Sequence, residues 1–233
     1  MPGCSKVAFL KSSWFASPAL TLKPSSRENP AAKVPKLKES HDAARYDFFT
    51  PEQIHQLAAA AADPQDGAIY LLAAFTGLRR GECVALKWQD VDFENSSIRV
   101  YEGFTREVGR PKSRRSRTVP MVDEVADALL EQRERLGESA PNDLVFPGEL
   151  GDYMDPSALR RRYVKDVAAA GLPPLRFHDL RHTFGSLAIN HASIVQVQNW
   201  MGHADIKTTM RYLHHKSRAD EARVLSQAFR TDA

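Results

Sequence analysis

The sequence predicts an α+β domain that is mainly α-helical and holds a small three-stranded antiparallel sheet. Two observations carry this prediction. Apolar residues recur at helical spacing over most of the chain after Thr50. Between Trp88 and Val119 the period changes towards two, the spacing of half-buried strands. A length of 233 residues is sufficient for one large domain with a well-buried core.

Helix boundaries follow from capping residues. Thr50-Pro51-Glu52-Gln53 combines a Thr N-cap, a Pro at the first helical position and a Gln at the third. It predicts a helix through Ile54 and Leu57 that ends near Asp63-Pro64. Further helices are predicted over Ile69–Phe75, Arg80–Lys87, Asp123–Leu136, Pro156–Ala170, His178–Asn190, Ile194–Met201, Ile206–His214 and Lys216–Phe229.

The three strands lie in the middle of the sequence. They are predicted at Val91–Phe93, Ile98–Tyr101 and Arg117–Val119. The helix that follows them is amphipathic, and four of its apolar side chains are expected to face the core: Val125, Leu129, Leu130 and Leu136.

Composition and charge exclude several classes of protein. With 42% hydrophobic and 26% charged residues, this is an ordinary globular composition. No apolar run approaches the roughly 18 residues of a membrane span, and no signal-peptide pattern is present. Cys4 and Cys83 make no disulfide framework. We therefore expect a cytoplasmic protein with no membrane partner.

The charge is unevenly distributed. Residues 1–45 hold eight Lys or Arg against three acids and have little periodicity, which indicates a basic arm or linker. Residues 46–233 form the expected folded domain and carry a small negative net charge. Nucleic-acid binding by this domain therefore requires a local basic face.

One such face is predicted between the second and third strands. Six basic residues occur there against one acid, and they are Arg106, Arg110, Lys112, Arg114, Arg115 and Arg117. A solvated hairpin tip is the ordinary explanation of such a run. Like charges repel one another unless an anion lies against them, however, and the DNA backbone is the commonest such anion. We therefore expect the five arginines to contact DNA.

A second polar group lies on one predicted helix. His178, Arg181 and His182 are spaced to share one helical face. A His pair with this spacing can bind zinc, but here Asp179 replaces the usual Glu and Arg181 would place a cation beside the metal. A guanidinium between imidazoles instead suits an oxyanion. We expect no metal at this position.

Three further residues look ordinary when taken singly. Arg79 suits the end of an apolar helix, and His203 after Gly202 suits a helix-capping position. Tyr212 has the spacing of a residue at the edge of a core. Only their combination with the other polar segments points to chemistry.

Together these segments resemble the tyrosine recombinases, the family of phage integrases and Xer-type resolvases. That family has Thr-Gly-Leu-Arg, a hairpin lysine, His-x-Leu-Arg-His, Leu-Gly-His and a tyrosine nine residues later. In this sequence the corresponding segments are Thr76–Arg79, Lys112, His178–His182, Met201–His203 and Tyr212, in the family's order. The resemblance covers about Phe48 to His214 and implies an integrase-type catalytic domain.

The resemblance also implies roles for these residues. Tyr212 would attack a DNA phosphodiester, leaving a 3′-phosphotyrosyl link and a free 5′-hydroxyl. Arg79 and Arg181 would bind the non-bridging oxygens, and His203 would donate a hydrogen bond to the phosphate. Lys112 would protonate the leaving oxygen. His178 would act as general base, with Glu82 and His182 in supporting positions.

The expected partners are double-stranded DNA and further copies of the chain, as a tetramer on DNA. No cofactor is expected, because the phosphotyrosyl bond keeps the energy needed for rejoining. Known members carry a DNA-clamp domain before the catalytic domain, and residues 1–45 show no such pattern, so full strand exchange is left open. Two alternatives remain: a decayed recombinase that only binds DNA, and a metal-dependent hydrolase. The last predicted helix, Lys216–Phe229, is expected to dock either on its own domain or on a neighbouring protomer.

Overall fold

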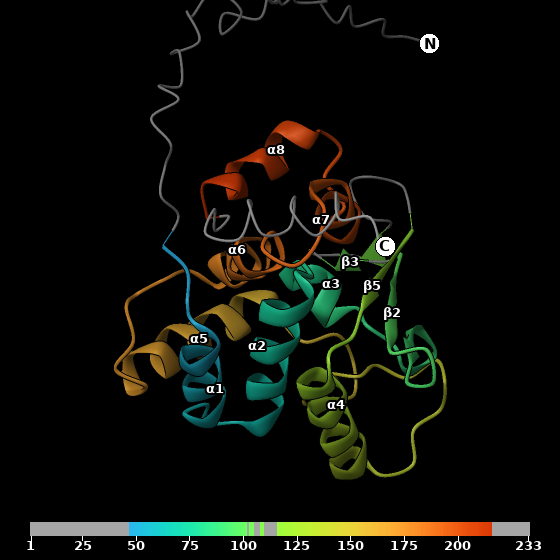
Figure 1. The fold of residues 1–233 in the computed structure, drawn as a ribbon. Helices are drawn as coiled ribbons and strands as arrows, with labels where there is room; N and C mark the ends of the chain where they lie inside the picture. The colour runs from blue at the N-terminus through green and yellow to red at the C-terminus, as the bar shows by residue number, and fades with distance from the viewer. Residues whose placement is uncertain (1–46, 102, 105–107, 110–115, 216–233) are drawn as a thin grey trace, which may run out of the picture. The chain divides into compact units, whose positions relative to one another are not determined.

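The computed structural model describes residues 47–101, 103–104, 108–109 and 116–215. The helices before the sheet are α1 (Pro51–Ala59), α2 (Pro64–Thr76), α3 (Arg80–Val84) and the 3₁₀-helix η2 (Trp88–Asp90). Those after it are α4 (Asp123–Leu136), α5 (Pro156–Ala169), α6 (Phe177–Ala188), α7 (Ile194–Met201), α8 (Ile206–Met210) and the 3₁₀-helix η3 (Arg211–His215). The mainly helical α+β prediction is confirmed (Figure 1). The predicted arm over residues 1–45 and the helix Lys216–Phe229 lie outside the described residues.

The small sheet is also confirmed. Its strands are β1 (Val91–Asp92), β2 (Ser97–Val100) and β5 (Arg117–Pro120), antiparallel and in the order β1-β2-β5. A separate antiparallel pair, β3 (Gly103–Phe104) and β4 (Val108–Gly109), lies between β2 and β5 in sequence. In the sheet, β5 is an edge strand, and α7 lies against it. The sheet thereby meets the C-terminal helices.

Capping decides where the first two helices begin and end. Thr50 and Gln53 form the predicted capping box, with N–H···O distances of 3.3 and 2.9 Å. Helix α1 ends at Ala59, earlier than predicted. Helix α2 begins at Pro64, before the predicted Ile69, because Asp63 caps it by accepting from the backbone N–H of Gln65 at 2.9 Å. Helix α2 ends at Gly77, which has a left-handed φ of 68°.

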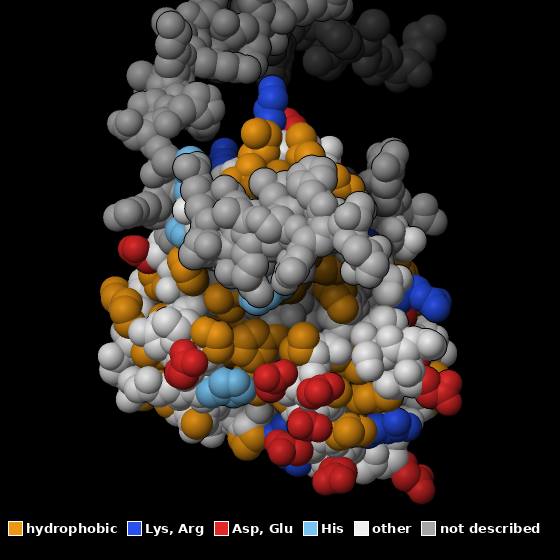
Figure 2. Space-filling view, viewed as in Figure 1, with side chains coloured by type: hydrophobic (Ala, Val, Ile, Leu, Met, Phe, Trp, Pro, Cys, Tyr) orange, Lys and Arg blue, Asp and Glu red, His pale blue; other side chains and the backbone are white. Residues whose placement is uncertain are grey.

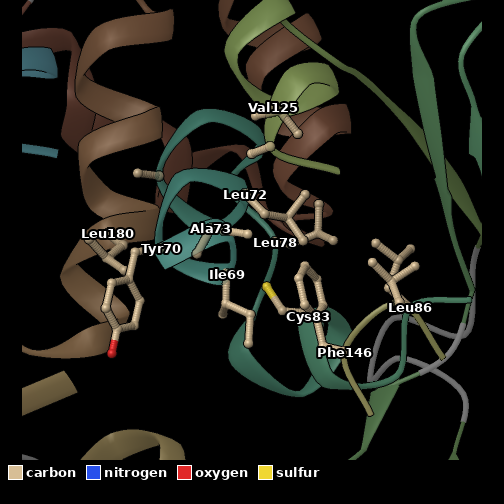
Figure 3. Close-up of a cluster of buried hydrophobic side chains, with 14 of the residues drawn as sticks. Ile69, Tyr70, Leu72, Ala73, Leu78, Cys83, Leu86, Val125, Phe146 and Leu180 are labelled. Carbon is tan, nitrogen blue, oxygen red and sulfur yellow. The ribbon is translucent and has the colours of Figure 1, made fainter. Parts of the chain in front are cut away.

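The main core surrounds α2, which packs against α1, α4 and α6 (Figure 1). Figure 3 shows how α2 and α3 fill this core, with side chains from α4, α6 and the loop after α4 around them. Fully burying one such side chain stabilises the fold by about 1.5–3 kcal/mol. The members of the main core that are labelled in Figure 3 are Ile69, Tyr70, Leu72, Ala73, Leu78, Cys83, Leu86, Val125, Phe146 and Leu180.

The prediction for α4 was half wrong. Val125 and Leu129 are fully buried, but Leu130 is 45% exposed and Leu136 is 37% exposed. The buried place one turn after Leu129 belongs to Gln132, whose amide donates to the Val145 carbonyl at 2.9 Å. The buried face of α4 is a single row of side chains that includes Val125, Leu129 and Gln132, and Leu130 lies outside this row.

A second, smaller core joins α6, α7 and η3. It consists of Phe184, Ile189, Val197, Met201 and Tyr212. These C-terminal elements lie together in Figure 1, at the opposite end of the view from α4. Among the described helices, none combines the length and the apolar character that a membrane crossing would need.

Candidate active site

The turn after α2 places the first predicted site residue. Arg79 is the N-cap of α3, and Glu82 lies in the first turn of that helix. One Glu82 oxygen accepts from the Arg79 backbone N–H at 2.8 Å, and the other accepts from Arg79 Nη1 at 3.0 Å. The Glu82 side chain is only 3% exposed, whereas that of Arg79 is 35% exposed. Glu82 therefore fixes Arg79 at the protein surface.

Arg181, on α6, lies close enough to Arg79 to be affected by its charge. It is 3% exposed, and its guanidinium donates to the carbonyls of Gly77 and Met201. Burial, and next the positive charge of Arg79, lowers the pKa of Arg181 to about 9, so the group stays cationic at neutral pH. Because its partners are carbonyls, its charge is not neutralised by them. A buried cation of this kind attracts an anion.

Arg117, which the sequence analysis assigned to DNA, has internal partners in the structure. This residue opens β5, its side chain is 8% exposed, and its two terminal nitrogens bind the two oxygens of Glu82 at 2.9 and 2.7 Å. A run of like charges in sequence does not reveal such an internal partner. The other residues of the predicted basic turn lie outside the described residues, and their roles stay predictions: Arg106, Arg110, Lys112, Arg114 and Arg115.

Glu82 is therefore shared between two arginines. Burial by itself would raise its pKa, but the hydrogen bonds and charge of Arg117, with the charge of Arg79, lower the pKa of Glu82 below its ordinary value. The carboxylate is ionised at neutral pH. Together with Arg181, whose guanidinium is affected by the charges of all three groups, three guanidinium charges stand against one carboxylate charge, which leaves this part of the site positive.

His203 follows the last turn of α7. Gly202 ends that helix with a left-handed φ of 63°, and His203 Nδ1 lies 2.9 Å from Thr209 Oγ1. Thr209 is fully buried in α8. Burial, followed by the charge of Arg181, lowers the pKa of His203 to about 3. The imidazole is neutral at neutral pH, and its Nδ1 is fixed by Thr209.

Tyr212 lies in η3, between the two histidine-bearing segments. A hydrogen bond of 2.8 Å joins its hydroxyl to His182 Nδ1, and its ring is nearly parallel to that of His203, with centroids 6.4 Å apart. The residue is 2% exposed. Gly185 of α6 allows this close packing, since a Cβ there would come within 2.6 Å of the tyrosine ring.

The two histidines of α6 differ in position. His182 is half-buried against Tyr212, and burial, then His178, lowers its pKa to about 4. His178 is exposed, and its ring stands perpendicular to that of His182 with centroids 5.1 Å apart. Desolvation by neighbouring protein atoms and the charge of Arg181 lower the pKa of His178 as well. Of the two, His182 is the one that contacts the tyrosine.

A polar cleft of about 600 Å³ opens beside His203, between β5 and the end of α7. Its lining residues are Ser116, Arg117, Thr118, Gln198, Asn199, Gly202, His203 and Ala204. Hydroxyl, amide and imidazole groups of this kind donate to phosphate oxygens. Within the described ranges, no three His, Cys, Asp or Glu side chains converge as metal ligands would.

Comparison with known proteins agrees with this geometry. The sequence matches the family described as the phage integrase family over residues 47–218. The chain belongs to the phage integrase family. A XerC-like tyrosine recombinase of Caldanaerobacter subterraneus subsp. tengcongensis is 30% identical over 226 residues, which cover 84% of this chain and 58% of the relative. XerC of Corynebacterium efficiens is 33% identical, over 75% of this chain and 54% of its own length.

Solved integrase-family structures share the fold. The XerA recombinase has a TM-score of 0.60 and 29% identity, over 79% of this chain and 66% of that structure. The Tn1549 transposon integrase with circular intermediate DNA has a TM-score of 0.63 and 25% identity, over 81% of this chain and 69% of that structure. The first three curated relatives are matched over only 46% to 58% of their length.

The structure brings together all the predicted site residues of this integrase-family chain that it describes. Arg79, Arg181, His203 and Tyr212 converge around the end of α7, with Glu82, His178 and His182 beside them. Sequence reasoning missed the contact of His182 with the tyrosine, the internal role of Arg117 and the hydrogen bond of Thr209. Only Thr209 left a local signal, a hydroxyl six residues after its partner His203.

Proposed function

We propose that this chain cleaves and rejoins duplex DNA at specific sites through a covalent link to Tyr212. The observation that carries the proposal is the hydrogen bond of 2.8 Å between the Tyr212 hydroxyl and His182, beside Arg181 and His203. The related Tn1549 integrase was solved with circular intermediate DNA, which supports DNA as the substrate class. Residues 46–233 would form the catalytic domain.

The covalent step exchanges one phosphate ester for another. The Tyr212 oxygen forms a bond to phosphorus, the bond from phosphorus to the 5′-oxygen breaks, and a 5′-hydroxyl leaves. The 3′-phosphotyrosyl ester retains the energy of the broken bond. Reversal by another 5′-hydroxyl therefore rejoins strands without ATP or a redox cofactor.

His182 is the better placed acceptor for the tyrosine proton. Its Nδ1 is 2.8 Å from the hydroxyl, and its lowered pKa leaves the ring neutral, so that Nδ1 can accept. The bound phosphate would raise that pKa by its negative charge and strengthen the base. This reverses the order expected from sequence, which made His178 the base and gave His182 a supporting place. His178 would then act on the same phosphate from its exposed position.

The remaining groups would stabilise charge on the phosphate. Arg79 and Arg181 would bind its non-bridging oxygens, and His203 would donate from Nε2 while Thr209 holds Nδ1. Lys112, which lies outside the described residues, would supply the proton to the leaving 5′-oxygen. Each such group is worth about 100-fold or more in rate in related chemistry.

Attack requires that Tyr212 be uncovered. At 2% exposure, the residue is packed in the small core of α6, α7 and η3. The phosphorus atom must come within bonding distance of its oxygen, so we propose that DNA binding shifts α8 and η3. Assembly as a tetramer on DNA, in the cytoplasm, completes the proposal. Whether strand exchange follows cleavage depends on the whole protein, because the chain spans about half of its curated relatives.

The test begins with selection of bound duplexes from a random pool. A nicked duplex carrying the selected site is then incubated with the protein, and denaturing electrophoresis detects a covalent adduct. We expect an adduct with wild type and none with Tyr212→Phe, which retains the ring and lacks the nucleophile. Binding without any wild-type adduct would support the DNA-binding alternative. Hydrolysis without an adduct, abolished by a chelator, would support the metal-dependent hydrolase.

A further inference from the structure

Three successive backbone carbonyls at the end of α7 accept hydrogen bonds from three different arginines. Arg117 Nε donates to the Trp200 carbonyl at 2.7 Å, Arg181 donates to that of Met201, and Arg79 donates to that of Gly202 at 3.3 Å. The last carbonyls of a helix have no partner within the helix and carry its negative dipole end. This arrangement, which we call the arginine cap, immediately precedes His203.

We infer that Arg117 is a positioning residue of the proposed cleavage site. It joins Glu82 to the Trp200 carbonyl at the end of α7 and makes no DNA contact. The inference rests on the proposed function. Arg79 and Arg181 are assigned to the phosphate, whereas Arg117 has no assigned part in the reaction. Its position between the two groups that it contacts explains why a buried arginine opens β5.

All three guanidinium nitrogens of Arg117 donate hydrogen bonds. Its Nη1 and Nη2 bind the two Glu82 oxygens at 2.9 and 2.7 Å, and its Nε binds the Trp200 carbonyl. Only 8% of the side chain is exposed, against 35% for Arg79. A bidentate pair of this kind fixes orientation as well as distance, which a lysine ammonium cannot do.

The side chain also supports the turn that carries His203. A Cβ built on Gly202 would lie 3.1 Å from Arg117 Cδ and 3.2 Å from Nε and Nη1. The backbone of the turn therefore rests directly on the Arg117 side chain. Displacement of that side chain leaves the turn unsupported and Trp200 without its hydrogen-bond donor.

Charge gives Arg117 a second effect. Glu82 is buried and lies next to Arg79, so an unneutralised carboxylate there would repel a phosphate and compete for Arg79. Arg117 neutralises that carboxylate and shares its Oε1 with Arg79. Arg79 and Arg181 then keep their attraction for the anion. An uncharged Glu82→Gln side chain has no such need of Arg117, which makes the inference testable.

The experiment compares wild type with Arg117→Met, Arg117→Lys, and Arg117→Met combined with Glu82→Gln. Arg99→Met, at an exposed position on the neighbouring strand β2, is the matched control. Each protein receives the nicked duplex selected above, and single-turnover adduct formation is measured at saturating DNA. The dissociation constant for the same duplex is measured across a range of salt concentrations.

We expect adduct formation by Arg117→Met to fall about 100-fold, the scale at which misplaced catalytic groups lose rate, while DNA affinity stays within about threefold. Arg117→Lys is expected to lie between Arg117→Met and wild type. The added Glu82→Gln should restore about tenfold of the rate, because it removes the carboxylate that Arg117 neutralised. A merely structural role would give no such restoration.

A direct contact between Arg117 and DNA would give a different pattern of rate and affinity. If Arg117 contacts DNA, Arg117→Met will weaken binding and lower the salt slope by about one, with an unchanged rate at saturation. That outcome, or an unrestored double variant, overturns the inference. A wild type that forms no adduct overturns the proposed function instead.

The positioning role of Arg117 is then tested without DNA, by NMR of the Trp200 indole and the His203 ring. Shifts in Arg117→Met and not in Arg99→Met support positioning, and unchanged signals overturn it.

Discussion

At the scale of single residues, neutral histidines are a defining property of this site. His182 and His203 are held uncharged by burial and by neighbouring cations, and each is fixed through Nδ1 by a hydroxyl group. A neutral imidazole fixed at one nitrogen presents a defined donor or acceptor at the other. Thr209 and Tyr212 therefore act as partners that set the histidine tautomers.

Thr209→Val tests this point, since it keeps the β-branched shape and removes the hydroxyl. For His203 to donate from Nε2 to phosphate, its Nδ1 must accept from Thr209. Without that donor we expect the proton to move partly to Nδ1, and adduct formation to fall between about 10- and 100-fold, as when other orienting partners of a functional histidine are removed. Nitrogen chemical shifts of the His203 ring report the tautomer. Thr208→Val, at the exposed neighbouring position, should change neither quantity.

The same histidines make stability depend on pH. In the unfolded chain they titrate near 6.5, whereas the folded pKa values are about 4 for His182 and about 3 for His203. As the pH falls below 6.5, the unfolded chain binds protons that the folded chain does not. We therefore expect the free energy of unfolding to be greatest above pH 6.5 and to decrease towards pH 4.

Urea unfolding at a series of pH values measures this decrease. His182→Gln and His203→Gln should each flatten the curve between pH 6.5 and 4, because each removes one proton taken up on unfolding. Thr208→Val, at an exposed position of α8 with no titratable side chain, is the control and should leave the slope as in wild type. An unaltered slope in the first two variants would show that these histidines are not held neutral.

At the scale of elements, local signals in the sequence predicted most of the architecture. The Thr50 capping box and the change of period after Trp88 placed α1 and the three-stranded sheet. Leu130 was misplaced because hydrophobicity alone does not show which residues share a stripe with Leu129, or that Gln132 finds buried hydrogen-bond partners. One partner of Gln132, the Val145 carbonyl, belongs to a loop beyond the helix.

In the site, too, some features could be predicted from the sequence and others could not. The resemblance gave the residue types and their order, and the structure brings the described ones together. The partner of Arg117 is 35 residues away in sequence, and the tyrosine that contacts His182 is 30 residues away. Local charge patterns carry no information about such pairs. Arg117 was therefore grouped with its neighbours in the basic turn, although its hydrogen bonds point inward.

Packing between α6 and η3 yields a prediction about Tyr212, the proposed nucleophile. A methyl group at Gly185 would come within 2.6 Å of the Tyr212 ring, so Gly185→Ala should displace the tyrosine from His182. Overpacking of this kind costs about 1–3 kcal/mol, against a gain of about 1 kcal/mol for Ala over Gly in a helix. We expect slower adduct formation and a net loss of stability of up to about 2 kcal/mol. Ser186→Ala, at the next buried position of α6, should leave the rate unchanged.

At the scale of the whole molecule, charge separates two ends of the described domain. Acidic side chains gather over α4 in Figure 2, while the site lies with α6, α7 and α8 at the other end of Figure 1. The exposed acids of α4 are Asp123, Glu124, Asp127, Glu131 and Glu134. DNA carries a dense negative charge, so this end should face away from it. The small negative net charge of residues 46–233 thus conceals an uneven distribution of charge over the domain.

The orientation can be measured through salt dependence. Each arginine that neutralises a phosphate adds about one to the slope of log affinity against log salt. We expect Arg114→Gln and Arg115→Gln, in the predicted basic turn, each to lower that slope by about one for the selected duplex. Glu131→Gln and Glu134→Gln on α4 should leave the slope as in wild type, because α4 is expected to face away from the DNA. Equal effects at the two ends would mean that DNA also contacts α4, and the proposed binding face would then be wrong.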